Sequence, residues 1–405
     1  MNKFYKFAAV SAIALVCAEA HAAGYQLNEY SVTNLGRSFA GVGVSGDDYS
    51  ALAYNPAGMT LIKRSGVQVG STVTQVHSKA KGEGRFAGQK TDMDFLIPLP
   101  SAFGQYNVND KLFLGAGIYV PFGLATRYGH DSFVANGPTG ARKSELEVID
   151  FNLSAAYKLN SNLSLGASAI FRRITGSLTS NLMGGRGYSD FKVKGYTGTF
   201  NIGAMYEFNE NARIGLSYRH KSIQKTSGKH YISIPAMQMN EKYHSASDPE
   251  LPASIILSGY FKTAPKWATT ATVKYTLWHR FGIFPGKSTW PRRRNLDVPY
   301  RWKDAWNVAL GEDYYLNNNW TLRAGVAYDQ SPSRSNTYRT NRIPDSDRVW
   351  LSLGASYAKD NYQVDFGFAH LFFAHGKTKN SPSGDVDAKY HSYSNMLGLN
   401  FQYKF

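Results

Sequence analysis

Apolar and polar side chains alternate along the last segment of the chain, from His391 to Phe405. A period of two residues predicts a β-strand with one apolar and one polar face. A strand that separates lipid from the lumen of a barrel needs this pattern, although the edge strand of a soluble sandwich shows it too. The apolar parity holds Tyr393, Leu397, Leu399, Phe401, Tyr403 and Phe405, with Asn395 as the exception, and the polar parity holds Ser392, Ser394, Met396, Gly398, Asn400, Gln402 and Lys404.

Earlier segments show the same period with weaker contrast, at 112–120, 149–159, 320–328 and 362–369. About ten residues are enough for a tilted strand to cross a membrane. The end of the chain favours a membrane barrel over a sandwich, because Phe405 with Tyr403 two residues before it resembles the assembly signal of outer-membrane barrels. We therefore expect the barrel-assembly machinery to be a partner of the last strand.

Short polar turns and longer polar stretches follow one another along the chain. Outer-membrane barrels have short turns on one side of the membrane and long loops on the other. Six short turns, with both ends of the barrel on the short-turn side, give seven hairpins. The sequence thus predicts an all-β fold, a 14-stranded antiparallel transmembrane β-barrel. The short turns are Asn107–Asp110, Asn160–Asn162, Asn209–Asn211, Thr263–Lys266, Asn317–Asn319 and Lys359–Asn361; the long stretches are Thr126–Ser144, Ser177–Lys194, Gln224–Pro252, Arg280–Arg301 and His375–Lys389.

The first 22 residues are typical of an export signal. Lys3 and Lys6 precede or flank an apolar run from Phe7 to Ala18, and Ala20-His21-Ala22 offers a cleavage site after Ala22. Cys17, the only cysteine, is expected to leave with this peptide. No later segment is apolar enough for a membrane helix, which needs about 20 residues. With the terminal strand, this indicates the outer membrane of a Gram-negative bacterium.

Residues 23–62 differ from everything that follows. They are rich in glycine, hold the acidic pair Asp47-Asp48 and close on Asn55, Pro56 and Ala57. They show neither sustained alternation nor a long helical stripe, which predicts compact irregular structure. A small irregular domain before many strands suggests an insert held by a container. We predict a hatch at 23–62 that plugs a barrel at 63–405.

The chain is basic, with 45 Lys and Arg against 29 Asp and Glu and a formal charge of +16. Such an excess fits nucleic acid or an anionic membrane surface. The basic residues are dispersed and no nucleic-acid-binding signature accompanies them, so we expect outer-membrane lipid and lipopolysaccharide as partners and no nucleic acid. The cluster Arg292–Arg294, beside Trp290, either clamps lipopolysaccharide phosphates or is an ordinary solvated loop.

Proline and glycine interrupt one predicted strand, at Val120, Pro121 and Gly123. Proline lacks an N–H and is tolerated in sheets only at edges or bulges, and glycine permits a kink. In a closed barrel, a broken ladder here is a local gap in the wall. The other interpretation is that Pro121 ends the strand where its loop begins.

The chain resembles the FadL family of outer-membrane channels for long-chain fatty acids, some relatives of which pass aromatic hydrocarbons. The resemblance covers nearly the whole mature chain. It lies in the residues 23–29, 35–37, 47–48, 55–57, 109–111, 119–126, 155–157, 302–311, 327–332 and 343–348, and in the terminal strand. It implies a fourteen-stranded barrel plugged by an N-terminal hatch, and an inward kink with a lateral opening in the third strand, where Gly123 matches a kink residue.

The resemblance also implies ligand-binding residues. Tyr25 matches a position that lies by the bound ligand, and we place Phe122 with it. Arg173 aligns with an arginine that contacts the carboxylate, but it shares parity with apolar positions, whereas Arg172 has the lumen-side parity. Lys303, with Arg301, lies near a second basic contact of the family. Each of these cations can also be an ordinary lumen or rim charge, and we favour that interpretation for Lys303 and Arg301.

These observations predict a monomeric, passive channel for long-chain fatty acids and similar hydrophobic compounds. Capture in outer loops would precede lumen binding, hatch rearrangement and lateral release. An aromatic-hydrocarbon channel of the same family is the alternative. We found no catalytic motif, metal-site motif or cofactor signature, so we expect no enzyme and no cofactor. A phospholipase-type enzyme assembled by folding and a polar general porin are the remaining rivals.

Overall fold

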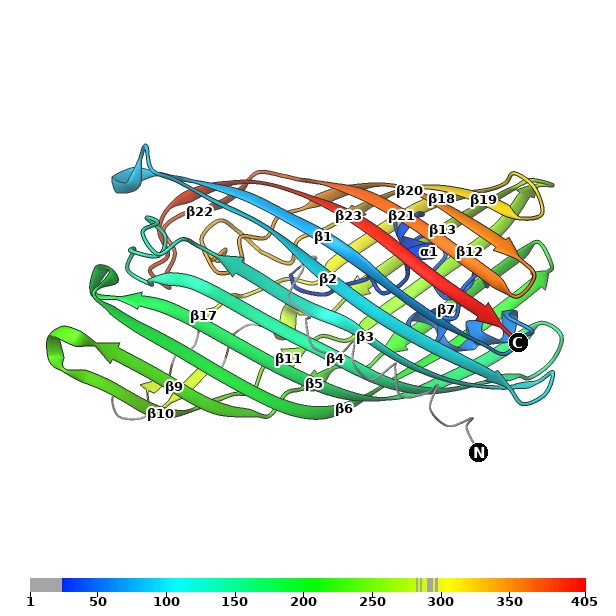
Figure 1. Ribbon diagram of the computed structural model, residues 1–405, viewed down its shortest axis with the longest axis horizontal. Helices are drawn as coiled ribbons and strands as arrows, with labels where there is room; N and C mark the ends of the chain where they lie inside the picture. Colours follow the sequence, from blue (N-terminus) through cyan, green and yellow to red (C-terminus); the bar gives the residue numbers. More distant parts are fainter. Residues whose placement is uncertain (1–23, 282, 285, 290–293, 296–297) are drawn as a thin grey trace, which may run out of the picture.

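The computed structural model describes residues 24–281, 283–284, 286–289, 294–295 and 298–405 (Figure 1). Fourteen antiparallel strands form a barrel, which closes because the last strand pairs with the first. This confirms the predicted fold. In order around the wall they are β1 (Gly66–Gly82), β2 (Lys90–Asn107), β3 (Leu112–Arg127), β4 (Ala141–Lys158), β5 (Leu163–Leu182), β6 (Gly187–Asn209), β7 (Ala212–Arg219), β12 (Ser254–Ala264), β13 (Trp267–Thr276), β18 (Ala305–Tyr315), β19 (Trp320–Asp329), β20 (Arg348–Lys359), β21 (Tyr362–Phe373) and β23 (Ala388–Lys404).

Short connections join the strands at one end, and each of the six predicted turns lies between two wall strands. Two predicted loops are wrong in part. Most of Ser177–Lys194 belongs to β5 and β6, and Gln224–Pro252 contains the hairpin of β9 (Thr226–Ile234) and β10 (Met239–Ser247), which pairs with β6 (Figure 1). Strands that extend beyond the lipid need no apolar outer face, so their polar composition is the same as that of a loop.

The remaining elements are short and lie at the long-loop end or in its connections. Predictions about residues 1–22, and about Trp290, Arg292 and Arg293, lie outside the described residues. The short elements are β8 (Ser222–Ile223), β11 (Glu250–Leu251), β14 (Ile283–Phe284), β15 (Gly286–Ser288), β16 (Arg294–Asn295), β17 (Val298–Pro299), β22 (Gly376–Thr378), η3 (Gly84–Phe86), η4 (Met183–Gly185), η5 (Pro235–Met237) and η6 (Trp278–Arg280).

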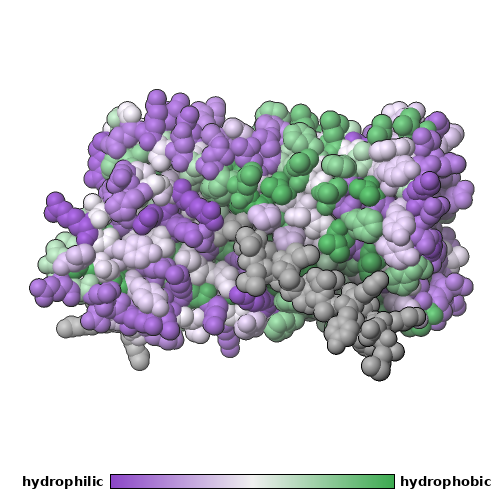
Figure 2. Space-filling view, viewed as in Figure 1, coloured by the Kyte–Doolittle hydropathy of each residue, from purple (hydrophilic) through white to green (hydrophobic). Residues whose placement is uncertain are grey.

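The two faces of the wall differ as the alternation predicts. On β23, the outward Leu397 and Leu399 are more than half exposed, while the inward Asn400 and Gln402 are buried. On the face shown in Figure 2, apolar side chains gather nearer the short-turn end, and the long-loop end is mostly polar. No helix of the described residues is long and apolar enough to cross a membrane.

Residues 24–62 lie inside the barrel (Figure 1). They hold α1 (Val32–Leu35), α2 (Ala51–Tyr54) and η2 (Pro56–Leu61), and nearly all of them are buried. The side chain of Ser31 caps α1 by accepting from the N–H of Asn34 at 3.1 Å. The predicted hatch is therefore a plug that the wall surrounds.

Glycines on the inner face let the wall approach the hatch backbone. A Cβ atom on Gly325 would overlap the backbone of Arg37, and one on Gly354 would lie 2.7 Å from the Cα of Gly36. The same close approach to hatch atoms occurs at Gly115, Gly166, Gly203, Gly215, Gly311, Gly367 and Gly398. We call these nine residues the glycine girdle. Because they have no side chain, the inner face of the wall packs directly against the plug at these positions.

Replacing Gly325 by alanine should destabilise the folded protein, because the added methyl group collides with backbone that no side-chain rotation can clear. Overpacking of this kind costs about 1–3 kcal/mol. Gly104→Ala is the control, since its Cβ would make only ordinary contacts, 3.8 Å to a methyl group of Val67 and 3.9 Å to the carbonyl oxygen of Gly66. Urea unfolding in detergent micelles measures both; equal stability of the two variants would contradict the close packing of hatch and wall.

Candidate functional site

The wall is interrupted beside β3. β2 pairs with β3 only as far as the pair Ala102 and Ile118, although β2 continues to pair with β1 along its length. On its other side, β3 shifts register against β4 between Tyr119 and Phe122. The strand nevertheless continues to Arg127, so Pro121 does not end it. The backbone edge of β3 beyond Ile118 is thus left without its strand partner.

The hatch occupies this edge. The N–H of Leu27 donates to the carbonyl of Pro121 at 2.8 Å, and the N–H of Gly123 donates to the carbonyl of Tyr25 at 2.9 Å. Gln26 and Phe122 form the bridge between these two bonds. A backbone group at an open edge needs a partner when water is excluded. Residues 25–27 therefore replace β2 at the break.

Apolar side chains line the break. Leu27 of the hatch packs in one buried cluster with Ile97 and Leu99 of β2 and with Val120 of β3. Val120 contributes only its side chain to this cluster, whereas Pro121 and Gly123 supply the backbone groups that bind the hatch. The opening in the hydrogen-bonded wall is therefore filled by hydrocarbon.

The opposite side of the same hatch segment contacts β13 and the outer loops. The Lys274 amine donates to Oδ1 of Asn28 at 2.8 Å, and the Thr276 hydroxyl donates to Oε1 of Gln26 at 3.0 Å. The N–H of Gly24 donates to Asp345 at 3.1 Å. Residues 24–28 thus bridge the lumen between β3 and β13.

Tyr25 lies in an aromatic cluster. Its ring centroid is 4.9 Å from that of Trp278, 5.4 Å from Phe281, 5.7 Å from Trp302 and 6.0 Å from Phe122. Burial raises the pKa of the Tyr25 phenol well above its ordinary value, so the ring stays neutral. The structure thus places both Tyr25 and Phe122 in one apolar pocket of the lumen, and we call these five residues the aromatic cluster.

The space beside the aromatic cluster is nearly filled in this structure. The free volume between Asn28, Lys274, Trp278 and Asp329 is only about 10 Å³. That is barely enough for one water molecule and far too small for an acyl chain or an aromatic ring. A hydrophobic ligand therefore needs the hatch segment to move.

Arg172 points into the lumen, as its parity predicts. Its guanidinium binds Asp150 in a bidentate ion pair of 2.6 and 2.8 Å, donates to the Ser222 hydroxyl at 2.6 Å and lies 5.2 Å from the Phe122 ring centre. Arg219 lies 3.3 Å from the same carboxylate. Arg172 thus already has a bidentate carboxylate partner and lies against Phe122, although Asp150 is shared by two arginines and the group keeps one positive charge.

Arg173 points away from the lumen. Its side chain is 41% exposed and lies 3.6 Å from Glu147. The register of β5 against β4 is unbroken at this level, so no bulge turns Arg173 inward. The lumen contact implied by the family alignment is therefore wrong for this residue.

Lys303 and Arg301 are at the rim. Lys303 is half-buried, and its N–H donates to the carbonyl of Pro332 at 2.9 Å. Arg301 is exposed and lies over the ring of Tyr338. Within the described residues, neither forms an ion pair. Lys274 was not predicted from the sequence. The pattern that could have revealed it is a lysine on the same inward face of β13 as several threonines.

The residues predicted for the hatch hold it together and fix it to the wall. Asp47 lies 3.0 Å from Arg37 and 3.0 Å from Arg323 of β19, and Asp313 of β18 binds the same two arginines. Two buried arginines and two aspartates thus form a neutral cluster between plug and wall, which is what burial of charge requires.

Asp48, Asn55, Pro56 and Ala57 act within the hatch. Asp48 accepts from the hydroxyls of Ser31 and Ser50 at 2.5 and 2.7 Å. Asn55 caps η2 by accepting from the N–H of Ala57 at 3.1 Å, with Pro56 at the first helical position. The amide of Asn55 also donates to the carbonyl of Ala204 at 3.1 Å, which ties η2 to β6.

A family model described as the outer membrane protein transport protein family (OMPP1/FadL/TodX) matches residues 13–405. The chain belongs to this family. It is 30% identical over 451 residues to a long-chain fatty acid transport protein of Escherichia coli, with 99% of each chain covered. It is 33% identical over 470 residues to outer membrane protein P1 of Haemophilus influenzae, with 100% of each covered.

Solved structures of similar fold agree. A FadL homologue of Pseudomonas aeruginosa is 24% identical, with a TM-score of 0.86 and coverage of 95% of this chain and 100% of that one. The toluene transporter TodX of Pseudomonas putida is 18% identical, with a TM-score of 0.75 and coverage of 94% and 99%. This FadL-family chain is therefore an outer-membrane β-barrel, and the resemblance read from its sequence is confirmed.

Glu29 is a buried carboxyl in the hatch of this family member. One oxygen accepts from the N–H of Asn28 at 2.6 Å, and the other has no hydrogen-bond partner among the described residues. Burial raises the pKa of Glu29 to about 7, the nearby Arg348 opposes this rise and Asp329 adds to it. The carboxyl therefore exchanges its proton near neutral pH.

Glu29 should make the stability of the protein depend on pH. Its folded-state pKa lies above its ordinary 4.5, so its contribution is fully present below pH 4.5 and is lost as the pH rises through about 7. The loss amounts to about 3 kcal/mol. In Glu29→Gln, the free energy of unfolding measured between these pH values should fall less steeply, whereas Glu210→Gln in an exposed turn should follow the native profile. Parallel profiles of native protein and Glu29→Gln would show that the proton is not bound there.

Proposed function

We propose that this protein is a channel for the passive uptake of long-chain fatty acids and similar hydrophobic compounds. The observation that carries the proposal is the position of residues 24–28, which close the apolar pocket and at the same time fill the break in β3. One movement of this segment would open both. A water-filled pore serves such solutes poorly, whereas a plugged barrel with a hydrocarbon-lined side exit suits them.

Transport would proceed in four steps. A ligand captured by the outer loops displaces Tyr25 from the aromatic cluster. The displaced segment gives up its hydrogen bonds to Pro121 and Gly123. The ligand then leaves sideways between β2 and β3, past Leu99 and Val120, into the membrane. The ligand exchanges one apolar surrounding for another along this route, and the hydrogen bonds to Pro121 and Gly123 can form again after its release, so no energy source is required.

The relatives support a transport role over a phospholipase-type enzyme. The curated matches include a protein named for long-chain fatty acid transport, and one similar fold belongs to a toluene transporter. The aromatic cluster around Tyr25 would suit an aromatic hydrocarbon as well as an acyl chain, so a hydrocarbon channel remains the second candidate. The polar partner of the ligand separates the two.

Lys274 is our candidate for binding a fatty-acid carboxylate. Its buried amine has the Asn28 amide oxygen as its hydrogen-bond acceptor and forms no ion pair within the described part of the chain. Lys274 lies on the same face of β13 as Thr276, two residues away, and lines a small cavity with Trp278 at the edge of the aromatic cluster. A ligand carboxylate that replaced Asn28 would neutralise the amine and detach the hatch segment from β13.

Lys274→Met should weaken oleate binding and leave toluene binding unchanged. A charge-assisted hydrogen bond is worth about 1.5–3 kcal/mol, which corresponds to a rise in Kd of roughly tenfold or more. Fluorescence titration of purified protein in micelles measures both ligands. Arg173→Met, on the outer face, is the matched control and should bind oleate normally. Unchanged oleate affinity in Lys274→Met would favour the hydrocarbon channel.

Restoring a regular strand at the break should block release. In the double substitution Pro121→Val and Gly123→Val, β3 gains an N–H and the conformational preference for continuous pairing with β2. We expect oleate uptake by cells that lack other transporters of this kind to fall about tenfold, while binding to purified protein stays within a few-fold. Gly104→Val, on β2 where pairing is complete, is the control. Normal uptake in the double variant would rule out the side exit.

We also propose that the barrel works as a monomer, since its wall closes on itself through β1 and β23. The C-terminal strand, ending in Phe405, would present the signal for the barrel-assembly machinery.

A further inference from the structure

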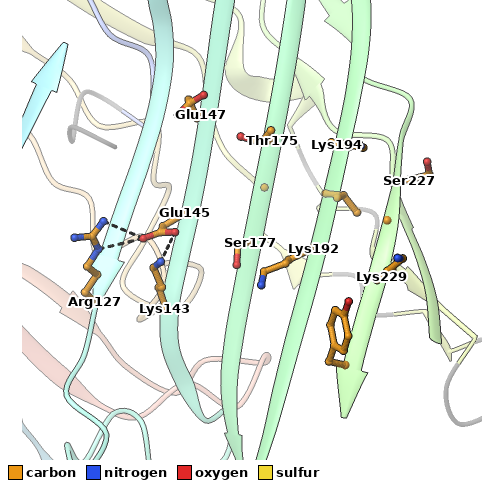
Figure 3. Close-up of a pocket in the computed structure, with 14 residues that line it drawn as sticks. Arg127, Lys143, Glu145, Glu147, Thr175, Ser177, Lys192, Lys194, Ser227 and Lys229 are labelled. Atoms are coloured by element: carbon orange, nitrogen blue, oxygen red, sulfur yellow. Dashed lines mark hydrogen bonds and ion pairs between the residues drawn. The ribbon is translucent and has the colours of Figure 1, made fainter. Parts of the chain in front are cut away.

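A basic groove lies on the outer face of the wall, near the long-loop ends of β4, β5 and β6 (Figure 3). Its free volume is about 600 Å³. Six charged side chains of its lining are Lys192, Lys194, Lys229, Glu145, Arg127 and Lys143. None of them belongs to the lumen site described above, and we call this feature the outer basic groove.

Strand register shows that the groove faces outward. Thr175 pairs with Lys194, and Ser177 pairs with Lys192, on the parity of β5 and β6 that also carries the exposed Phe171 and Tyr196. The rings of Phe171 and Tyr196 stack with centroids 5.6 Å apart. These rings belong to the apolar band that meets lipid, because exposed aromatic residues mark the membrane interface of such barrels. The groove thus begins one strand repeat beyond that band.

The groove has a surplus of positive charge. Glu145 binds both Lys143 and Arg127, the latter at 3.0 Å (Figure 3). Lys192 lies 2.7 Å from Asp190. Lys194 and Lys229 form no ion pair within the described residues, although they point to the same opening. Cations that cluster without matching carboxylates bind phosphate well.

On the outer side of β1 and β23, two lysines near the long-loop end are paired with carboxylates. There Lys79 lies 3.7 Å from Asp92, and Lys389 lies 2.6 Å from Glu83. Lys194 and Lys229 differ from these two lysines because neither is paired with a carboxylate within the described residues, and they lie beyond the exposed rings of Phe171 and Tyr196.

We propose that the outer basic groove binds the phosphorylated headgroup of lipid A, the lipid portion of lipopolysaccharide. Its phosphates would contact Lys192, Lys194 and Lys229, and its acyl chains would run along Phe171 and Tyr196. The site lies at the long-loop end of an outer-membrane barrel, where the outer leaflet carries this phosphorylated glycolipid. The adjacent rings give a lipid phosphate an advantage over free phosphate, because only the lipid buries apolar surface there.

The test compares the triple variant K192A/K194A/K229A with the native full chain in detergent micelles, using diphosphoryl lipid A as the probe. Each lysine near a phosphorylated surface contributes about 1 kcal/mol, so the Kd should rise tenfold or more. The matched control is K79A/K81A/K389A, whose lysines lie on β1 and β23, and it should bind like the native protein. Resistance to unfolding in cold SDS checks that each barrel is intact; if the triple variant is not, the single variant Lys194→Gln should still raise the Kd about threefold.

Three further probes identify the source of the phosphate. Dephosphorylated lipid A should bind the native protein much more weakly, inorganic phosphate at millimolar concentration should not displace lipid A, and phosphatidylglycerol should bind less tightly than lipid A. An unchanged Kd in the folded lysine variants would overturn the site. Displacement by inorganic phosphate, or equal affinity for phosphatidylglycerol, would overturn the assignment to lipid A.

Discussion

The structure depends on the requirement that every backbone N–H and C=O group within a membrane finds a partner. A closed barrel meets it by pairing each strand with two neighbours. β3 lacks one neighbour over part of its length, because β2 leaves it after Ile118. The hatch backbone at Tyr25 and Leu27 takes the empty place. The break is thus tolerated because another segment of the same chain completes it.

The interior is polar in the way that a plugged barrel must be. The hatch places Arg37 and Asp47 against Asp313 and Arg323 of the wall, and the four charges, of which only Asp47 is partly exposed, neutralise one another. Around Tyr25 the interior is apolar, because aromatic rings surround this residue. The plug is consequently held by charge at its base, whereas its N-terminal segment is held by weaker, reversible contacts.

The sequence predicted the architecture well, because alternation on β23 and the polar turns report directly on lipid-facing strands. The sequence did not distinguish loops from polar strands beyond the lipid, because the extended ends of β5 and β6, and the strands β9 and β10, have the composition of loops. Parity predicted that Arg172 faces inward, but it could not show that this arginine and Arg219 share the carboxylate of Asp150. Lys274 was missed because its significance comes from Asn28, which lies far away in the sequence.

The glycine girdle links the evolution of the two parts of the molecule. The glycines of the girdle lie on many strands of the wall, and all of them pack against the short hatch. A larger hatch side chain at one of these contacts would collide with the wall, and a smaller one would leave a cavity beside the glycine. Hatches exchanged between distant family members should therefore fit poorly unless the complementary glycines are transferred with them, so plug and barrel are inherited as one unit.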